Sequence, residues 1–295
     1  MVKEREPILF VIRPFAGIGN IHRLTDKVSK SLHNSRYVAL VSVVDEDAEL
    51  QRVVKEFIGN GYNKVFAVGG NAAVSQVATH LANTEASLGI VPVGSGNGLA
   101  RHLRIPSDIG KAVRIVHRQK IAMIDYGLAN DTPFFCNAGL GFDADVALRF
   151  SKLAKRNFWS YAIASLCEFS KAKAKLFRIY DNGHTLHKEA FSISIANASQ
   201  FGHHAYIAPD ADLTDGLLDV TVVSPFPKFF APSVGIKLFN GTIGKSRYVE
   251  MFRVRHLAIE REDEYAYLHV DGIPLAAGST VEFNIKPLGL KVYVP

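Results

Sequence analysis

Residues 88–103 read Leu-Gly-Ile-Val-Pro-Val-Gly-Ser-Gly-Asn-Gly-Leu-Ala-Arg-His-Leu. The apolar run 89–93 is typical of a buried strand, and the apolar residues from Leu99 onward begin a helical face. The glycine-rich loop 94–98 lies between them. Backbone N–H groups at such a strand-to-helix turn favour a bound phosphate, helped by the helix dipole. For this loop taken alone, a tight turn with glycines for geometry only is the slightly favoured alternative.

Two further stretches repeat this design. Residues 65–73 read Val-Phe-Ala-Val-Gly-Gly-Asn-Ala-Ala, and a helix is expected at 74–81. Residues 8–20 join another apolar strand to a loop that holds two glycines. Because α/β proteins bind ligands at the carboxyl ends of their parallel strands, we expect the three loops to line one edge of a sheet.

Strands and helices alternate through the first 120 residues. Apolar runs predict the strands, and apolar residues at helical spacing predict the helices between them. This alternation predicts a parallel sheet with right-handed crossovers. The strands are expected at 8–12, 37–44, 65–68 and 88–93, and the helices at 22–32, 47–58, 74–81 and from Ser107 or Asp108 to Val116.

The pattern changes from about Ile121. Strand-like runs separated by turn residues follow, and several alternate apolar and polar residues, as half-buried antiparallel strands do. One helical stretch, 144–175, interrupts them. We therefore expect an α/β domain at 1–124 and a β-rich domain at 125–284. The strands of the second part are expected at 122–128, 133–138, 175–180, 189–196, 217–223, 247–254, 256–260, 265–270, 280–285 and 290–294.

The composition is that of a soluble globular protein. The 295 residues are 48% hydrophobic and 21% charged, and no apolar run is long enough to span a bilayer. Two cysteines, Cys136 and Cys167, do not suggest a disulfide framework, so a reducing cytoplasm is expected. The net charge of +6 suits an anionic partner such as a nucleotide or an acidic membrane surface. No basic and aromatic stripe of the kind that grips nucleic acid is present.

Four motifs, at 91–101, 136–147, 207–220 and 270–275, carry a family resemblance. They read Val-Pro-Val-Gly-Ser-Gly-Asn-Gly-Leu-Ala-Arg, Cys-Asn-Ala-Gly-Leu-Gly-Phe-Asp-Ala-Asp-Val-Ala, Ile-Ala-Pro-Asp-Ala-Asp-Leu-Thr-Asp-Gly-Leu-Leu-Asp-Val and Val-Asp-Gly-Ile-Pro-Leu. With them the chain resembles the diacylglycerol kinase-like lipid kinases, a superfamily that includes sphingosine kinases and, more distantly, NAD kinases. The resemblance implies a NAD kinase-like first domain, a β-sandwich second domain, and a C-terminal tail, 285–295, that returns to the first. It also implies ATP and Mg²⁺ as cofactors.

The loops and the resemblance together predict a nucleotide site. Glycine-rich loops let phosphates approach backbone N–H groups. By resemblance, Ser95 matches a threonine or serine that contacts the nucleotide, and Ser42 occupies the position of a threonine near it. An ordinary strand serine is the favoured alternative for Ser42. The expected nucleotide-binding residues are Ser42, Gly69, Gly70, Asn71, Ala72, Ala73, Gly94, Ser95, Gly96 and Asn97.

Two positions depart from the family pattern. Where the family has Gly-Gly-Asp-Gly-Thr, residues 69–73 read Gly-Gly-Asn-Ala-Ala. The uncharged amide of Asn71 neither holds Mg²⁺ nor takes a proton well, and Ala72 puts a methyl group where a phosphate would approach. Bacterial relatives place a glutamate, their proposed proton acceptor, where Ile273 stands. Because general base catalysis contributes on the order of 10²–10⁴-fold, we expect low activity.

Four aspartates are candidates for the remaining chemistry. Asp271 lies two residues before the missing glutamate, and Asp145 belongs to a segment that, in sphingosine kinases, contributes an acid to the lipid head-group site. These two are the expected catalytic residues, whereas Asp143 and Asp125 are weaker candidates. A surface or helix-capping aspartate is the alternative for each.

The run Asp-Leu-Thr-Asp-Gly-Leu at 212–217 resembles the structural Mg²⁺ site of the bacterial lipid kinases. Hard cations take carboxylate and carbonyl oxygens, and a tight turn supplies several at once. By resemblance, the ligands are Asp212, Asp215 and the carbonyl of Leu217. An acidic turn before a strand is the alternative.

The expected function is an ATP-dependent lipid kinase that transfers the γ-phosphate to a diacylglycerol- or sphingosine-like hydroxyl, with the nucleotide cleft between the domains. A non-catalytic nucleotide or lipid sensor or scaffold of the same fold is the alternative. A dinucleotide-binding oxidoreductase is weaker, because the loops lack the Rossmann spacing. A cytoplasmic setting is expected, and a homodimer and a peripheral position at the inner membrane face stay open. The phenylalanines and lysine at 226–230 are a weak membrane signal.

Overall fold

The computed structural model describes residues 5–14, 20–33, 35–94, 96–153, 157–181, 183–262 and 266–295, with only the backbone of Phe158. The chain divides into two units. Unit 1 comprises Met1–Ile124 and Leu288–Pro295, and unit 2 comprises Asp125–Pro287. Each unit has its own buried apolar core.

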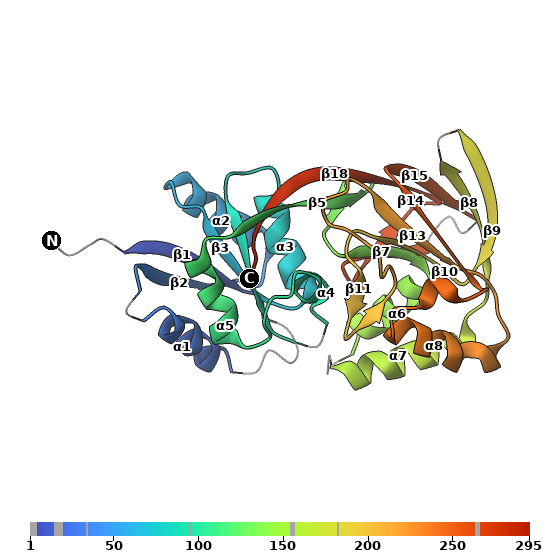
Figure 1. The fold of residues 1–295 in the computed structure, drawn as a ribbon, viewed down its shortest axis with the longest axis horizontal. Coiled ribbons are helices and arrows are strands. Elements are labelled where there is room, and N and C mark those ends of the chain that lie inside the picture. Colours follow the sequence, from blue (N-terminus) through green and yellow to red (C-terminus); the bar gives the residue numbers. More distant parts are fainter. Residues whose placement is uncertain are drawn as a thin grey trace. The chain divides into compact units, whose positions relative to one another are not determined.

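Unit 1 is built on a parallel sheet in the order β2-β1-β3-β4, with the end of β18 beside β4 (Figure 1). All of these neighbouring pairs are parallel, and Lys291 of β18 lies opposite Ser87 of β4. The residues of β3 and β4 are buried almost throughout, as a sheet covered on both faces requires. The bounds are β1 (Glu6–Ile12), β2 (Tyr37–Val43), β3 (Lys64–Gly69), β4 (Ser87–Pro92) and β18 (Thr280–Tyr293).

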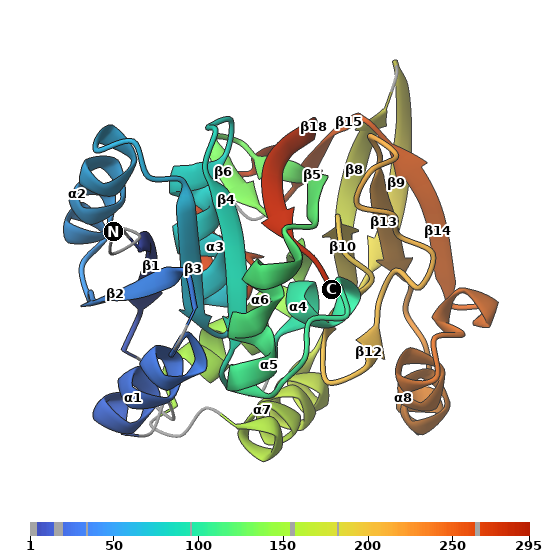
Figure 2. The same cartoon turned by 60° about the vertical axis from the view of Figure 1, so that its left-hand side comes forward.

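Helices cover both faces of this sheet. Helix α1 packs with α5 on one face, and α2 packs with α3 on the other (Figures 1 and 2). Two of the helices begin at side-chain caps, because Asn20 accepts from the N–H of Arg23 at 3.0 Å and Asp108 accepts from that of Lys111 at 2.8 Å. The bounds are α1 (Ile21–Ser31), α2 (Asp47–Gly59), α3 (Asn71–Leu81), α4 (Gly98–His102), α5 (Ile109–Arg114) and the 3-10 turn η1 (Ile115–Arg118).

Unit 2 is a sandwich of two mainly antiparallel sheets. One has the order β14-β13-β10-β7-β16-β17, and the other contains the first part of β18 followed by β15, β8 and β9, with β5 paired to β18 and β6 paired to β5. Side chains from both sheets, among them Leu140, Ile195, Ile259 and Phe283, form one core cluster. The strand bounds are β5 (Ile121–Ala129), β6 (Thr132–Phe134), β7 (Asn137–Gly141), β8 (Lys175–Asp181), β9 (His184–Ala190), β10 (Ser192–Ala196), β13 (Leu218–Val223), β14 (Val249–Val254), β15 (His256–Arg261), β16 (Ala266–Val270) and β17 (Ile273–Ala277).

Three longer helices and several short elements complete unit 2. The helices are α6 (Phe142–Ser151), α7 (Phe158–Lys171) and α8 (Ala231–Phe239), and the 3-10 turns are η2 (Lys228–Phe230) and η3 (Ile243–Lys245). Among the described residues, strands β11 (Gln200–Gly202) and β12 (Ala205–Tyr206) form a separate two-stranded sheet. In the described part of the chain, no helix has the length and apolarity needed to cross a membrane.

The predicted fold class, a parallel α/β part followed by a β-rich part, is confirmed. Several element predictions are wrong. The helix predicted over 144–175 is two helices, α6 and α7, and Lys175 already begins β8. The strand predicted over 189–196 is divided at Phe191, and the two strands predicted after Thr280 are the single strand β18. Helix α8 and strand β17 were not predicted.

Candidate functional site

The loops that follow β3 and β4 lie side by side in unit 1. We call residues 69–73 and 94–98 the loop pair. Gly69 and Pro92 end the two strands opposite each other, and the N–H of Val93 donates to the carbonyl of Gly69 at 3.0 Å. The side-chain oxygen of Asn71 accepts a hydrogen bond of 2.7 Å from the backbone N–H of Gly98. The two glycine-bearing turns therefore share one edge of the sheet.

The first part of the loop pair is also the start of a helix. Helix α3 begins at Asn71, directly after Gly70, so Asn71, Ala72 and Ala73 form its first turn rather than a loop before it. Its N-cap residue, Gly70, offers no side-chain acceptor to this turn. A helix N-terminus of this kind directs backbone donors and the positive end of the helix dipole at an anion.

The second part of the loop pair is organised by Asn97. This residue has a left-handed backbone, with φ of 60°, and its side-chain N–H₂ donates to the carbonyl of Gly94 at 3.0 Å. Its side-chain oxygen is buried and has no partner among the described residues. Arg101 closes the loop from the other side, with Nε donating to the carbonyl of Gly96 at 3.2 Å. Ser95 and the third glycine loop, at 15–19, lie outside the described residues.

Ser42 lies farther along the same sheet. It is half-buried in β2, opposite Val11 of β1, and Val11 in turn lies opposite Ala67 of β3. Ser42 is therefore two strands from the loop pair, roughly 10 Å away at the usual strand spacing. No contact joins it to the described part of the loop pair, so its nucleotide role stays a prediction.

Asp271 is a buried anchor in unit 2. Asp271 and Gly272 form the two-residue turn between β16 and β17, with φ of 49° and 81°. The Asp271 carboxylate accepts three backbone hydrogen bonds of 2.8–3.0 Å, from the N–H groups of Phe135, Cys136 and Asn137, and the residue is 2% exposed. These contacts hold residues 135–137 in place, and the catalytic role predicted for Asp271 stays a prediction.

The next acids lie on helix α6. Asp145 is exposed in the first turn of this helix, which also contains Asp143.

Ile273 is half-buried at the start of β17, opposite Val270. Its side chain offers an apolar surface where the bacterial relatives are expected to have a carboxylate.

Asp143 belongs to a polar cluster that surrounds a glycine. Gly139 of β7 lies opposite Ser194 of β10 and opposite His269 of β16. A Cβ at Gly139 would be 2.7 Å from His269 Nε2 and 3.1 Å from Asp143 Oδ2. The hydroxyl of Ser194 donates to the Asp143 carboxylate. Glycine is needed at this position because these two side chains occupy the space above it.

Burial shifts the ionisation of the two titratable members of the cluster. Burial raises the pKa of Asp143 to about 6, although hydrogen bonds from Ser194 and Ser192 act in the opposite direction. Burial lowers the pKa of His269 to about 4, and its Nδ1 has no hydrogen-bond partner in the described part of the chain. Neither His269 nor Ser194 was among the site residues predicted from the sequence. A histidine inside an otherwise apolar strand was the only available signal.

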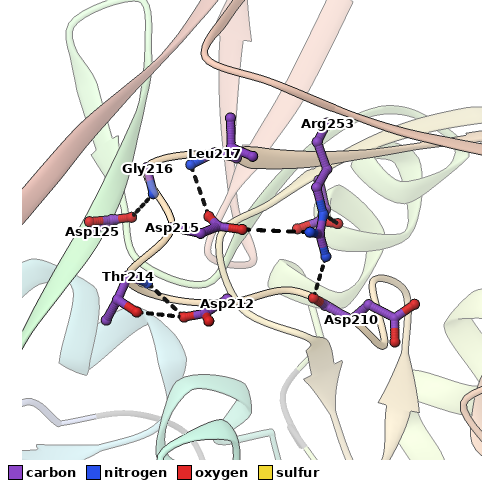
Figure 3. Close-up of polar contacts among 9 residues, drawn as sticks. Asp125, Asp210, Asp212, Thr214, Asp215, Gly216, Leu217 and Arg253 are labelled. Atoms are coloured by element: carbon purple, nitrogen blue, oxygen red, sulfur yellow. Dashed lines mark hydrogen bonds and ion pairs between the residues drawn. The ribbon is translucent and has the colours of Figure 1, made fainter.

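Figure 3 shows the turn 212–217, which we call the acidic turn. Asp212 accepts from the N–H of Thr214 at 2.9 Å and from its hydroxyl at 2.7 Å. Asp215 accepts from the N–H of Leu217 at 3.0 Å. The buried Asp125 of β5 accepts from the N–H of Gly216 at 2.7 Å, which ties the turn to that strand.

Arg253 of β14 supplies a positive charge to the acidic turn (Figure 3). Its guanidinium lies 3.7 Å from the Asp215 carboxylate and 3.0 Å from that of Asp219, and it donates to the carbonyl of Asp210 at 2.5 Å. Arg253 was not among the site residues predicted from the sequence, because it is far from these acids along the chain.

The donors of the acidic turn fit a hard cation. Among the described residues, no three His, Cys, Asp or Glu side chains are grouped to hold a metal ion. The predicted site needs only two carboxylates, from Asp212 and Asp215, and one carbonyl, from Leu217. These are the oxygen ligands that Mg²⁺ prefers, but Arg253 is an alternative cation for Asp215. The metal site stays a prediction.

Comparisons with known proteins give the family. The model of the diacylglycerol kinase catalytic domain matches residues 7–129, and that of the YegS C-terminal NAD kinase beta sandwich-like domain matches residues 137–294, more than half of the chain. This chain belongs to the diacylglycerol kinase-like lipid kinase family. A probable lipid kinase YegS-like protein of Pseudomonas aeruginosa is 32% identical over 259 residues, which are 86% of this chain and 84% of that protein.

Three further proteins are similar to this chain. A diacylglycerol kinase of Mycobacterium tuberculosis is 28% identical over 302 residues, covering 94% of this chain and 96% of that protein. An uncharacterized Synechocystis protein is 30% identical over 249 residues, and the match spans only 58% of its length. The crystal structure of a diacylglycerol kinase from Bacillus anthracis shares the fold, with a TM-score of 0.72 at 19% identity, covering 98% of this chain and 97% of that one.

Proposed function

We infer that this protein is an ATP-dependent lipid kinase that transfers the γ-phosphate of ATP to a hydroxyl group of a diacylglycerol- or sphingosine-like lipid. One observation carries this proposal. The two glycine-bearing turns of unit 1 are joined by the hydrogen bond between Asn71 and Gly98, beside the uncapped start of α3. Two adjacent turns of this kind make a cradle for a polyphosphate.

The loop pair supplies what phosphoryl transfer needs from a protein, namely positioning and neutralisation of phosphate charge. The backbone N–H groups of residues 70–73 and 94–97 would bind phosphate oxygens, with Ser95 adding a hydroxyl. The buried side-chain oxygen of Asn97 would accept a hydrogen bond from a bound ligand or water, since a buried acceptor without a partner is costly. Ser42 would contact the nucleotide outside the phosphates.

The two predicted catalytic aspartates differ in what they can do. Asp145 is exposed, so its carboxylate is open to an outside ligand, and we assign the contact with the lipid head group to it. The carboxylate of Asp271 already accepts three N–H groups, and taking up a proton would cost it part of these bonds. We therefore assign Asp271 a positioning role, through residues 135–137.

Mg²⁺ has two uses in this proposal. In the acidic turn, Asp212, Asp215 and the carbonyl of Leu217 would hold one ion that stiffens the turn. A second ion would supply neutralisation of the charge on the ATP phosphates. Since Asn71 is uncharged and already bonds Gly98, this ion would depend mainly on the nucleotide for its ligands.

The hydrogen bond between Asn71 and Gly98 also favours a second candidate function, that of a nucleotide-binding sensor without catalysis. Asn71 holds the loop pair together, and Ile273 provides no base, so the fold can bind nucleotide while the chemical step is very slow. The two functions differ in whether phosphate reaches a lipid.

An assay of phosphate transfer separates them. Purified protein is incubated with radiolabelled ATP, Mg²⁺ and detergent micelles that carry diacylglycerol, sphingosine or a related alcohol, and labelled lipid is counted. Wild type is compared with Asn71→Asp, Ile273→Glu and the double variant. Asp145→Asn is the variant expected to be inactive, and Asp131→Asn, an exposed aspartate in a turn between strands, is its matched control.

We expect slow labelling of lipid by the wild type, faster labelling by the double variant, and none by Asp145→Asn. Calorimetric binding of a non-hydrolysable ATP analogue, with no lipid labelled by any variant, would establish the sensor instead. Absence of both binding and labelling would refute the nucleotide site. Robust wild-type turnover that Asp145→Asn leaves unchanged would refute the role given to Asp145.

A further inference from the structure

Helix α7 has apolar side chains on its outer face as well as its inner one. Trp159, Ile163 and Leu166 are 72%, 60% and 73% exposed. Their spacing of four and three residues puts them on one face of the helix. Other residues of the helix pack against unit 2: Ala164 is buried, and the ring of Phe169 stacks on that of Phe226 with 5.8 Å between the ring centroids. Core packing therefore does not explain the outer face.

A second exposed apolar face lies on η2 and α8. Phe229, Ile236 and Phe239 are 76%, 65% and 49% exposed. Helix α8 has no buried residue at all, although its composition is strongly apolar. Leu238 of this helix packs, partly buried, against the small core cluster of unit 2 that contains Ile207. The exposed side chains of Phe229, Ile236 and Phe239 are left over from that packing, and apolar area of this kind suits an apolar partner outside the fold.

The two faces belong to one region of unit 2. Lys228, next to Phe229, donates from Nζ to the carbonyl of Ser170 near the end of α7 at 2.6 Å. Figures 1 and 2, which differ by a rotation about the vertical axis, both show α7 and α8 at the lower side of unit 2. We call the six exposed residues the α7–α8 apolar surface: Trp159, Ile163, Leu166, Phe229, Ile236 and Phe239.

The charges around this surface are almost all positive. Residues 224–249 contain four basic residues, Lys228, Lys237, Lys245 and Arg247, and no aspartate or glutamate. The one acid of α7, Glu168, is paired with Arg149 at 2.9 Å. Exposed Lys171 adds to the basic side at the end of α7.

We propose that the α7–α8 apolar surface docks unit 2 on an anionic phospholipid membrane, with its apolar side chains in the interface and its lysines against the lipid phosphates. Apolar area bordered by basic residues is what binds such a surface. A second copy of the chain is disfavoured as the partner, because a symmetric contact would bring like positive charges together. The inference rests on the proposed function in one respect, that the acceptor lipid lies in the membrane.

Sedimentation with vesicles tests the docking without any kinase activity. The full-length protein is mixed with vesicles of phosphatidylcholine alone or of phosphatidylcholine with phosphatidylserine. One variant combines Ile163→Ser, Leu166→Ser, Phe229→Ser and Ile236→Ser, and a second combines Lys171→Glu and Lys245→Glu. The matched controls lie elsewhere on the molecule: Leu176→Ser, an exposed leucine of β8, and Lys27→Glu with Lys30→Glu on α1.

We expect wild type and both controls to sediment with the anionic vesicles and not with phosphatidylcholine alone. Each of the two test variants should lower the affinity at least tenfold, since one basic residue near such a surface changes binding severalfold. Circular dichroism should show unchanged folding, because every replaced side chain is exposed. The proposal would be overturned if the wild type failed to bind anionic vesicles, or if the test variants bound them like wild type. It would also be overturned if light scattering showed that the wild type is a dimer and that the serine variant is not.

The two proposals fail in different ways. If the protein binds vesicles through this surface but labels no lipid in micelles or vesicles, docking stands and the kinase proposal fails. If the serine variant phosphorylates lipid in vesicles as fast as wild type, the kinase proposal stands and docking fails.

Discussion

The side-chain oxygen of Asn71 accepts a 2.7 Å hydrogen bond from the backbone N–H of Gly98, and this bond connects the two glycine-bearing turns of unit 1. Gly98 is buried at the start of α4, so its N–H has little access to water. Asn71 therefore has a structural use at the position where the family usually carries an aspartate.

The first prediction concerns this bond. Asn71→Ala should lower the free energy of unfolding by about 1–3 kcal/mol, because the buried N–H of Gly98 loses its acceptor. Asn71→Asp keeps an acceptor oxygen and should stay within about 1 kcal/mol of wild type. Denaturant unfolding measures both, with the exposed Gln51→Ala on α2 as a control. If Asn71→Ala left the free energy of unfolding unchanged, the loops would not depend on this contact.

The second prediction separates Asp145 from Asp271. Asp271→Asn should lower the free energy of unfolding by about 2–4 kcal/mol, because an amide cannot accept all three of the N–H bonds that the buried carboxylate accepts. Asp145→Asn should leave stability within about 0.5 kcal/mol, because the residue is exposed.

The effects on kinase activity should follow the opposite order, with the larger loss in the Asp145 variant. In a variant made active by Ile273→Glu, adding Asp145→Asn should lower kcat at least about 100-fold, the usual effect of a group that orients or deprotonates the acceptor. Adding Asp271→Asn should lower activity only as far as the folded fraction falls. A large loss of kcat in fully folded Asp271→Asn would instead make Asp271 a catalytic residue.

The parallel part of the fold could be predicted from sequence because its signals are local. Strands such as β3 and β4 are short apolar runs that end at glycines, and each is followed by a helix. Gly89 shows a limit even there. It lies within the glycine-bearing stretch 88–103, but a Cβ at this position would be 2.3 Å from the ring of Phe66, so packing inside the sheet explains it.

The misses in unit 2 come from elements without clear local signals. Residues 231–239 contain a proline and a glycine and bury no side chain, so α8 has little helical pattern to detect. Strand β17 contains Pro274, which argues against a strand unless the strand lies at a sheet edge, as β17 does. The site contacts were beyond sequence reasoning, because Asp271 is more than 130 residues from the N–H groups that it accepts.

The third prediction concerns the acidic turn and its cation. Arg253→Gln should lower the free energy of unfolding without Mg²⁺ by about 1–3 kcal/mol, because Asp219 and Asp215 lose their positive partner. Added Mg²⁺ should stabilise this variant more than wild type, since the ion no longer competes with the guanidinium for Asp215.

Thermal unfolding with and without Mg²⁺ measures this difference. Asp215→Asn removes one predicted ligand and should abolish the Mg²⁺ effect, whereas Asp131→Asn, in a turn between strands, should keep it. If Mg²⁺ changes the Tm of no variant, the acidic turn is held by Arg253 and the backbone alone.

The fourth prediction concerns pH and the cluster around Gly139. Burial raises the pKa of Asp143 from 3.8 to about 6, so the folded chain holds a proton that the unfolded chain releases between these values. The stability that this group contributes is fully present below pH 3.8 and is lost as the pH rises to 6. Burial lowers the pKa of His269 from 6.5 to about 4, so its contribution is present above pH 6.5 and is lost as the pH falls to 4.

Between pH 4 and 6 these two contributions oppose each other, and each amounts to roughly 3 kcal/mol over its full shift at 1.36 kcal/mol per pKa unit. Relative to wild type, Asp143→Asn should therefore lose stability on acidification from pH 6.5 to 4, because only the histidine still titrates. His269→Gln should gain stability over the same range. Denaturant unfolding at several pH values gives the slopes, which are independent of any constant cost of the substitutions. Equal slopes in both variants and wild type would mean that neither group is held in its buried protonation state.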